Sequence, residues 1–222
     1  RRMKEEGISP RFIDGLRVTD GPTIEIVQDV LSGINRRLSE KINNLGGRGH
    51  PLSAGSESVI RARKHSKSSS RKKDDIGFVG EVAGIESDAI LALAEKDVVP
   101  VIAPLGRDAS GRFYNINADI VAGAIAAQLQ AEKLVFLTDV GGIIRSQNGE
   151  DRPQAFSSLR REEIESLLDE GVIGGGMIPK VQAGLNALDK GVRKIHIIDG
   201  RIPHSLLLEI FTDKGIGTEI VR

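Results

Sequence analysis

Residues 115–142 constrain the fold of this chain more than any other stretch. They open with the polar sequence Asn-Ile-Asn-Ala-Asp, after which small side chains predict a helix over residues 120–131. The apolar residues 133–137 then predict a strand that ends in Thr-Asp-Val-Gly-Gly. Ligands of open parallel sheets bind at the carboxyl ends of strands, beside helix N-termini that favour anions. We therefore expect a phosphate-binding site here, with Asp119 and Asp139 as its first candidate residues.

Strand and helix patterns alternate along most of the chain. Apolar residues at three-four spacing predict a long helix over residues 23–43, which Thr19 or Asp20 is placed to cap. Further helices are expected over residues 88–96 (capped by Ser87), 161–170, 181–190 and 204–211, and further strands over residues 76–82, 98–104, 194–198 and 215–221. With 39% hydrophobic but only 3% aromatic residues, the core must be aliphatic. The expected fold is α/β, a three-layer αβα sandwich about a mainly parallel open sheet.

Composition argues against several kinds of site. The chain has no Cys, which excludes disulfides and thiolate metal sites, and its four His are scattered. We expect His196, in a predicted buried strand, and His204, at a helix start, to be structural. Basic and acidic residues number 31 each, so no overall charge favours nucleic acid or an anionic membrane. The sequence has no apolar run near the roughly 20 residues that span a bilayer, no signal-peptide pattern and no Walker pattern.

Residues 61–73 form a basic, Ser-rich run without aromatic side chains. Binders of single-stranded nucleic acid use aromatic side chains for base stacking, and this run has none. We therefore interpret it as a solvated flexible loop on a hairpin. Nonspecific attraction of nucleic acid is the remaining alternative.

Three consecutive glycines at residues 174–176 precede a predicted helix, and Lys180 sits just within that helix. Glycines let backbone N–H groups approach an anion closely, and a Lys one turn further on reaches the same phosphate. A plain glycine loop with a solvent-facing Lys is the simpler interpretation. Likewise, Asp119 could serve only the helix dipole, and Asn115 and Asn117 could be turn or capping residues.

Six motifs in one order make the pattern specific. They are Gly-Leu-Arg-Val-Thr-Asp (15–20), Gly-Phe-Val-Gly-Glu-Val (77–82), Tyr-Asn-Ile-Asn-Ala-Asp (114–119), Leu-Thr-Asp-Val-Gly-Gly-Ile (137–143), Gly-Gly-Met-Ile-Pro-Lys-Val (175–181) and Phe-Thr-Asp-Lys-Gly-Ile-Gly-Thr (211–218). Together they resemble the N-acetylglutamate kinases of the amino-acid kinase family. The resemblance covers nearly the whole chain except the basic run.

This resemblance implies transfer of the ATP γ-phosphoryl group to the side-chain carboxylate of N-acetyl-L-glutamate, a step on the route to arginine. Arg17 would pair with the acceptor carboxylate, and Asn115 and Asn117 would bind the acetylated amino acid. Asp119 would orient the catalytic lysines, and Lys180 would neutralise charge on the moving phosphoryl group.

The resemblance also implies a nucleotide site, with Mg²⁺ accompanying ATP. The sequence identifies no dedicated protein ligand for this metal. The residues that would hold the nucleotide are Asp139, Val140, Gly141, Gly142, Ile143, Ile144, Val172, Ile173 and Gly174. Residues 1–112 would form a partial acceptor lobe and residues 113–222 an ATP-binding lobe, with one continuous sheet through both.

The resemblance further implies a homo-oligomer, either a dimer or a hexamer, with no nucleic-acid partner and no membrane association. A cytoplasmic location is expected, or an organelle if a transit peptide lies upstream. Feedback by arginine is left open.

The chain departs from the family pattern at its start. The family's first strand, its Lys-x-Gly-Gly loop and its His-Gly-Gly-Gly-Pro loop are not among these residues, and the region Ser-Ala-Gly-Ser-Glu (53–57) has lost a Lys. We therefore expect an N-terminally truncated chain with little kinase activity alone.

Three alternatives to this function remain. The first is a kinase of N-acetyl-aminoadipate, whose acceptor differs by one methylene. The second is a catalytically dead paralogue that binds ligands or subunits. Carbamate and uridylate kinases are less favoured, because their acceptors do not call for Arg17 and Asn115.

Overall fold

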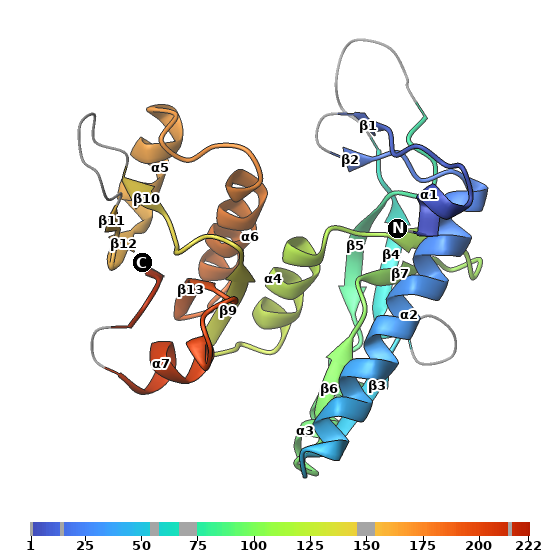
Figure 1. Ribbon diagram of the computed structural model, residues 1–222, viewed down its shortest axis with the longest axis horizontal. Coiled ribbons are helices and arrows are strands. Elements are labelled where there is room, and N and C mark those ends of the chain that lie inside the picture. Colours follow the sequence, from blue (N-terminus) through green and yellow to red (C-terminus); the bar gives the residue numbers. More distant parts are fainter. Residues whose placement is uncertain (1, 14–15, 54–57, 67–74, 146–153, 213–214) are drawn as a thin grey trace. The chain divides into compact units, whose positions relative to one another are not determined.

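The computed structural model describes residues 2–13, 16–53, 58–66, 75–145, 154–212 and 215–222. The chain forms two compact units, residues 1–121 and 122–222, each built from one unbroken run of sequence. Figure 1 colours them from blue to green and from green to red. The sequence placed a lobe boundary between residues 112 and 113, and its assignment of one ligand to each lobe stays a prediction.

The first unit packs helices against short sheets. Its helices are α1 (Arg2–Glu5), α2 (Gly21–Asn44), α3 (Ser87–Ala94) and the start of α4 (Ala118–Gln128). Its strands are β1 (Phe12–Ile13), β2 (Leu16–Arg17), β3 (Gly49–Leu52), β4 (Ile60–Lys64), β5 (Gly80–Ile85), β6 (Val99–Ile102), β7 (Leu105–Arg107) and β8 (Phe113–Asn115). Strands β5-β4-β7-β8 form one sheet in that order, and β3 pairs in parallel with β6. Helix α2 runs along β3 and β6 (Figure 1). Its buried Asn35 donates a hydrogen bond of 2.7 Å to the Val101 carbonyl of β6, which fixes the helix on the strand.

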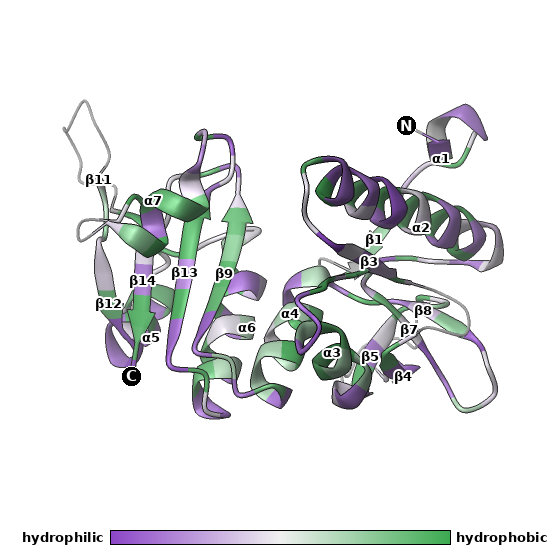
Figure 2. Cartoon of the chain, turned by 90° about the horizontal axis from the view of Figure 1, so that it is seen from below, coloured by the Kyte–Doolittle hydropathy of each residue, from purple (hydrophilic) through white to green (hydrophobic). Residues whose placement is uncertain are grey.

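The second unit is built around the sheet β12-β14-β13-β9. Its strands are β9 (Lys133–Thr138), β10 (Ile144–Arg145), β11 (Gln154–Ala155), β12 (Ser158–Arg160), β13 (Lys194–Asp199) and β14 (Thr218–Val221). Its helices are the rest of α4, α5 (Arg161–Asp169), α6 (Met177–Asp189) and α7 (Ser205–Phe211). Strands β9 and β13 pair in parallel from Lys133 to Thr138, whereas β14 runs antiparallel to β13. Figure 2 shows the apolar residues along β9 and β13, and Ile195, Ile197 and Val181 are fully buried in this core.

These elements give the mixed α/β fold that the sequence predicted, with helices on parallel-rich sheets as in an αβα sandwich. The long helix is confirmed as α2, and Asp20 caps it by accepting a hydrogen bond of 3.0 Å from Thr23 N. The expected cap at Ser87 is wrong, because Ser87 is already helical and Glu86 precedes α3 without a side-chain cap. The strand expected over residues 76–82 begins later, as β5, because Gly77 has φ +73° and turns the backbone there.

The basic run is ordered at its start, where the sequence led us to expect a loop. Strand β4 buries Ile60 and Ala62, whereas Arg61 and Arg63 point outward. The outward cations meet acids on or beside β5, with Arg61 Nε 3.0 Å from Glu86 and Arg63 Nε 2.9 Å from Glu81. These side chains are therefore largely neutralised by neighbouring acids. Residues 67–73 of the run lie outside the described residues. The sequence also indicates a polar insert, a hairpin or loop, over residues 145–153, of which residues 146–153 lie outside the described residues.

No helix in the described part of the chain is both long enough and apolar enough to cross a bilayer.

Candidate functional site

The first unit contains a cavity of about 670 Å³ that brings two of the predicted substrate residues together, Arg17 and Asn115. Its walls also include apolar side chains of α2 and residues of the N-terminal segment, namely Ile26, Val27, Val30, Leu31, Arg2, Met3, Ile8, Ser9 and Pro10. A guanidinium and an amide at the edge of an apolar cavity suit a small ligand that carries both a carboxylate and an apolar portion.

Arg17 is held by a short β-ribbon. Strand β2 pairs antiparallel with β1, and this pairing sets Arg17 opposite Phe12. The guanidinium carbon lies 5.2 Å from the centre of the Phe12 ring, within the range of a cation–π contact. Its Nη1 is 3.3 Å from Met3 Sδ, a weak acceptor. The half-buried guanidinium thus keeps strong donors for an anionic ligand.

Thr19 connects the two substrate residues, and the sequence analysis considered it only as a helix cap. Its fully buried hydroxyl donates to the Arg17 carbonyl at 3.0 Å and lies 3.5 Å from Asn115 Nδ2. Asn115 is fixed further by its own N–H, which donates to the Phe78 carbonyl at 2.9 Å. Thr19 therefore sets the distance between Arg17 and Asn115. The signal was available, because Thr19 belongs to the same motif as Arg17.

Gly77 is required where it passes Thr19. It has φ +73°, and a Cβ at this position would collide with the Thr19 carbonyl oxygen. The close approach lets Phe78 N donate to that same oxygen at 2.6 Å. Gly77 thus allows a close approach to a neighbouring chain segment, the backbone at Thr19.

Asn117 and Asp119 lie at the start of α4. The Asn117 side-chain oxygen accepts hydrogen bonds from Asp119 N at 2.9 Å and Ile120 N at 3.2 Å, so Asn117 caps the helix. This was the alternative that the sequence left open, and a role toward substrate stays a prediction. Asp119 is half-buried in the first helical turn. Its convergence with Lys180 on one phosphate also stays a prediction, since the two belong to different compact units.

The second unit contains a cavity of about 660 Å³ at the carboxyl end of β9. Four of the predicted residues line it: Asp139, Val140, Gly174 and Lys180. They come from two segments far apart in the chain, the turn after β9 and the loop that leads into α6. The sequence analysis missed the other lining residues, Leu137, Thr138, Gly176 and Met177, although all four lie inside the quoted motifs or the glycine run.

Lys180 lies in the first turn of α6, close to where the sequence placed it. Its Nζ is 5.2 Å from the centre of the Phe136 ring, so the amine rests over a buried strand residue. Gly174 and Gly176 have open space where a Cβ would stand, while Gly175 has φ +55°. The glycine loop therefore leaves room in front of a helix N-terminus that carries a lysine, an arrangement that attracts an anion.

The remaining predicted nucleotide residues divide into three groups. Ile143 and Ile173 are buried in the core of the unit, so they would reach a ligand only through their backbone. Gly142 packs against Thr218, and Ile144 pairs with Ala155 in the β10-β11 ribbon. For Gly141 and the partly exposed Val172, contact with the nucleotide stays a prediction.

An ion pair between a buried carboxylate and an exposed guanidinium lies at the same end of the sheet as this cavity. Asp199 ends β13 opposite Thr138 of β9, and the Arg201 side chain donates to it at 2.7 Å. Hydrogen bonding from Arg201 holds the pKa of Asp199 below its usual value. The hydrogen bond and charge of Asp199 raise the pKa of Arg201, and the negative charge of Asp139 raises it further. Arg201 therefore adds positive charge near Asp139 that the sequence analysis did not anticipate.

Among the described residues, no group of three or more His, Cys, Asp or Glu side chains could hold a metal ion. Asp139 supplies a carboxylate at the wall of the second cavity. Since Mg²⁺ in nucleotide sites keeps its waters and takes most of its ligands from phosphates, one such carboxylate fits a nucleotide-borne Mg²⁺.

Curated relatives match almost the whole chain. The acetylglutamate kinase of Desulforamulus reducens is 47% identical over 215 residues, which are 97% of this chain and 73% of that protein. That of Symbiobacterium thermophilum is 48% identical over all of this chain and 75% of its own length. The acetylglutamate kinase of Methanococcus maripaludis (strain C6) is 46% identical, again over 100% of this chain and 76% of the relative.

Solved structures share the fold. N-acetylglutamate synthase from Neisseria gonorrhoeae, complexed with coenzyme A and N-acetyl-glutamate, superposes with a TM-score of 0.82 at 26% identity. The match covers 99% of this chain but only 48% of the synthase, so the chain spans about half of that protein. A Streptococcus mutans protein, smu.665, gives a TM-score of 0.79 at 29% identity over 99% of this chain and 80% of that one.

The sequence profile described as "Amino acid kinase family" matches residues 1–199. With curated relatives at 46–48% identity over nearly its full length, the chain belongs to the amino acid kinase family, in its acetylglutamate kinase branch.

Proposed function

We propose that this chain binds N-acetyl-L-glutamate through Arg17 and Asn115 and transfers the γ-phosphoryl group of ATP to its side-chain carboxylate, a step of arginine biosynthesis. The guanidinium of Arg17 pairs with a carboxylate of the acceptor through two parallel hydrogen bonds. Asn115 donates to the acetylated amino acid, and Asn117 lies next along the same motif. The apolar side chains of α2 accommodate the methylene groups of the acceptor.

ATP occupies the cavity between the 139–142 turn and the glycine loop. Lys180 at the start of α6 neutralises charge on the phosphoryl group as it moves, and Asp119 orients that lysine. Mg²⁺ supplies further charge neutralisation when it is bound with ATP. Phosphoryl transfer needs such positioning and neutralisation more than covalent catalysis. The observation that best supports this proposal is the convergence of Asp139, Val140, Gly174 and Lys180 on one cavity.

Calorimetric titration of the chain tests both binding sites. A nonhydrolysable ATP analogue with Mg²⁺ and N-acetyl-L-glutamate should each bind with a Kd between about 1 μM and 1 mM, the usual range for enzyme substrates. Arg17→Lys keeps the positive charge but loses the planar, two-pronged guanidinium. It should therefore weaken the binding of N-acetyl-L-glutamate at least about tenfold and leave the binding of the ATP analogue unchanged. Arg11→Lys, in the same segment, is the matched control. Absence of binding by the wild type would refute the proposal, and tighter binding of N-acetyl-L-aminoadipate would identify a different acceptor.

Transfer itself is measured in a single turnover with the chain in excess over ATP. The product acyl phosphate is trapped with hydroxylamine as a hydroxamate. We expect hydroxamate to form slowly, in line with the low activity expected of this chain alone, and only when both substrates are present. Binding of both ligands without any hydroxamate would indicate a binding protein rather than a kinase.

We also propose that the chain forms a homo-oligomer, a dimer or a hexamer, and acts in the cytoplasm. Large apolar side chains stay exposed on α2 and α3, including Ile34, Leu38 and Leu91, and a subunit contact would cover such residues. Light scattering coupled to gel filtration gives the mass in solution. A monomer at micromolar concentration would contradict the assembly.

A further inference from the structure

Thr218 is a fully buried polar residue whose hydroxyl touches the end of the 139–142 turn. The Ile143 N–H donates to Thr218 Oγ1 at 2.9 Å. The preceding Gly142 has φ +118°, and a Cβ there would stand 2.6 Å from the same oxygen. The side chain of Thr218 therefore determines where two consecutive residues of the nucleotide-binding segment lie.

Two backbone hydrogen bonds hold the ends of this turn. Before it, the Thr138 carbonyl accepts a hydrogen bond of 2.8 Å from Gly200 N. After it, the Ile143 carbonyl accepts one of 2.9 Å from Phe156 N. Asp139 and Val140, which line the nucleotide cavity, lie between these fixed points. Replacing the Thr218 side chain should therefore shift the turn.

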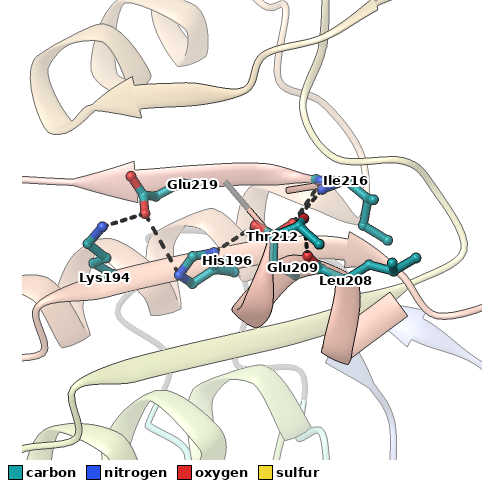
Figure 3. A network of polar contacts seen from close by, with 8 residues as sticks. Lys194, His196, Leu208, Glu209, Thr212, Ile216 and Glu219 are labelled. Carbon is teal, nitrogen blue, oxygen red and sulfur yellow. Dashed lines mark hydrogen bonds and ion pairs between the residues drawn. The ribbon is translucent and has the colours of Figure 1, made fainter. Parts of the chain in front are cut away.

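Thr218 is itself held rigidly at the start of β14. It pairs with Ile197 of β13, and the two preceding residues donate their N–H groups to the buried carboxylate of Glu209. Those distances are 2.7 Å from Ile216 and 3.1 Å from Gly217. Figure 3 shows Glu209 between Ile216 and His196, whose Nδ1 is 2.7 Å from the same carboxylate. Because these contacts fix Thr218, its hydroxyl can hold the Ile143 N–H at a defined position.

We infer that Thr218 is a positioning residue for the nucleotide, acting through Ile143 and Gly142 on Asp139 and Val140 without touching the ligand. This inference rests on the proposed nucleotide site. Without Oγ1, the Ile143 N–H is buried and unsatisfied, so the turn relaxes toward another partner or toward water. Displacing a binding group by about 1 Å costs much of its contribution.

Three variants test the inference. Thr218→Val removes the acceptor and keeps the volume, and Thr218→Ser keeps the hydroxyl. Thr212→Val is the matched control, because Thr212 is exposed and its hydroxyl bonds only within the same segment, to the Leu208 carbonyl at 2.5 Å. Each is titrated calorimetrically with the Mg²⁺-bound ATP analogue and with N-acetyl-L-glutamate. We expect Thr218→Val to weaken analogue binding about tenfold, which a loss of about 1.4 kcal/mol produces.

We expect Thr218→Ser to bind the analogue within about threefold of the wild type, and Thr212→Val to bind it unchanged. All variants should bind N-acetyl-L-glutamate normally, since its proposed residues belong to the other compact unit. Wild-type affinity in Thr218→Val, an equal loss in Thr218→Ser, or an equal loss of N-acetyl-L-glutamate affinity would each overturn the inference. No analogue binding by the wild type would instead refute the nucleotide site itself, and the inference with it.

A second measurement covers the case in which Thr218→Val does not fold. Amide hydrogen exchange at Ile143 in the wild-type chain should slow when the analogue is added, because the nucleotide stabilises the anchored turn. Unchanged exchange at Ile143 with the analogue bound would overturn the inference.

Discussion

Replacing Glu209 with alanine should strongly destabilise the second unit. Glu209 is only 8% exposed, and its carboxylate accepts hydrogen bonds from Ile216 N, Gly217 N and His196 Nδ1. The variant leaves all three donors without this acceptor, in a place that water reaches poorly. Figure 3 shows how these groups converge on Glu209.

The magnitude follows from the number of groups left unsatisfied. Each buried donor without a partner costs about 1–3 kcal/mol, and removing one partner of a buried charged pair costs about 3–5 kcal/mol. Because a small domain has a total stability of about 5–15 kcal/mol, a loss near 4 kcal/mol would remove a large share of it. With a urea slope of about 2 kcal/mol per molar, the unfolding midpoint should fall by about 2 M.

Urea unfolding followed by far-ultraviolet circular dichroism measures this loss. Glu209→Gln retains an oxygen for the two backbone donors, so its loss should be smaller, about 1–2 kcal/mol. Glu132→Ala is the matched control, because Glu132 is exposed and is bonded through its backbone carbonyl, to Lys194 N. It should change stability by less than about 0.5 kcal/mol. Equal midpoints for Glu209→Ala and Glu132→Ala would refute the reasoning.

The same group predicts the response to acid. Burial by itself would raise the pKa of Glu209, but hydrogen bonds from Ile216, His196 and Gly217 outweigh burial and lower the pKa. A carboxyl with a lowered folded-state pKa stabilises the protein above its unfolded pKa of about 4.3 and loses that contribution as the pH falls. The wild type should therefore lose more stability between neutral pH and pH 3 than Glu209→Gln does.

Three further predictions concern single residues. Gly77→Ala should lower the free energy of unfolding in urea by at least about 2 kcal/mol, because φ is +73° and the new Cβ meets the Thr19 carbonyl. An unchanged unfolding midpoint would contradict this. Asn117→Ala should cost about 1 kcal/mol by removing the cap of α4, and Asn117→Ser should recover most of it. Lys180→Met should lower single-turnover hydroxamate formation at least about 100-fold without changing N-acetyl-L-glutamate affinity, and a rate near that of the wild type would exclude Lys180 from the transfer step.

Elements with a strong local pattern could be predicted from the sequence. Helix α2 follows from its three-four apolar spacing and from Asp20, whose side chain caps the next turn. The Lys180 position follows from the glycine run before α6. Strand β4 could not be predicted in this way, because three of its five residues are cations and only Ile60 and Ala62 face inward. Its acidic partners, Glu81 on β5 and Glu86 directly after it, become apparent only when the strands are paired.

Motif position led to residues that line cavities. Arg17 and Asn115 line the first cavity and Asp139 and Lys180 the second, and their roles toward substrates stay predictions. The residues that hold them also belong to the quoted motifs, but which of them contact each other could not be predicted, because the contacts join distant segments. Thr19 and Asn115 are 96 positions apart, and Thr218 lies 75 positions from Ile143. No local periodicity encodes such contacts.

Tyr114 of β8 has an optical consequence. These 222 residues contain one Tyr and no Trp. The Tyr114 ring is buried in the first unit, and its centre lies 6.2 Å from that of the Phe78 ring. Its hydroxyl donates a hydrogen bond of 3.0 Å to Asp108. Tyr114 directly precedes Asn115 in the chain. The tyrosine absorption and emission of the chain therefore come from the first unit alone. A Trp placed in the second unit would give each unit its own reporter.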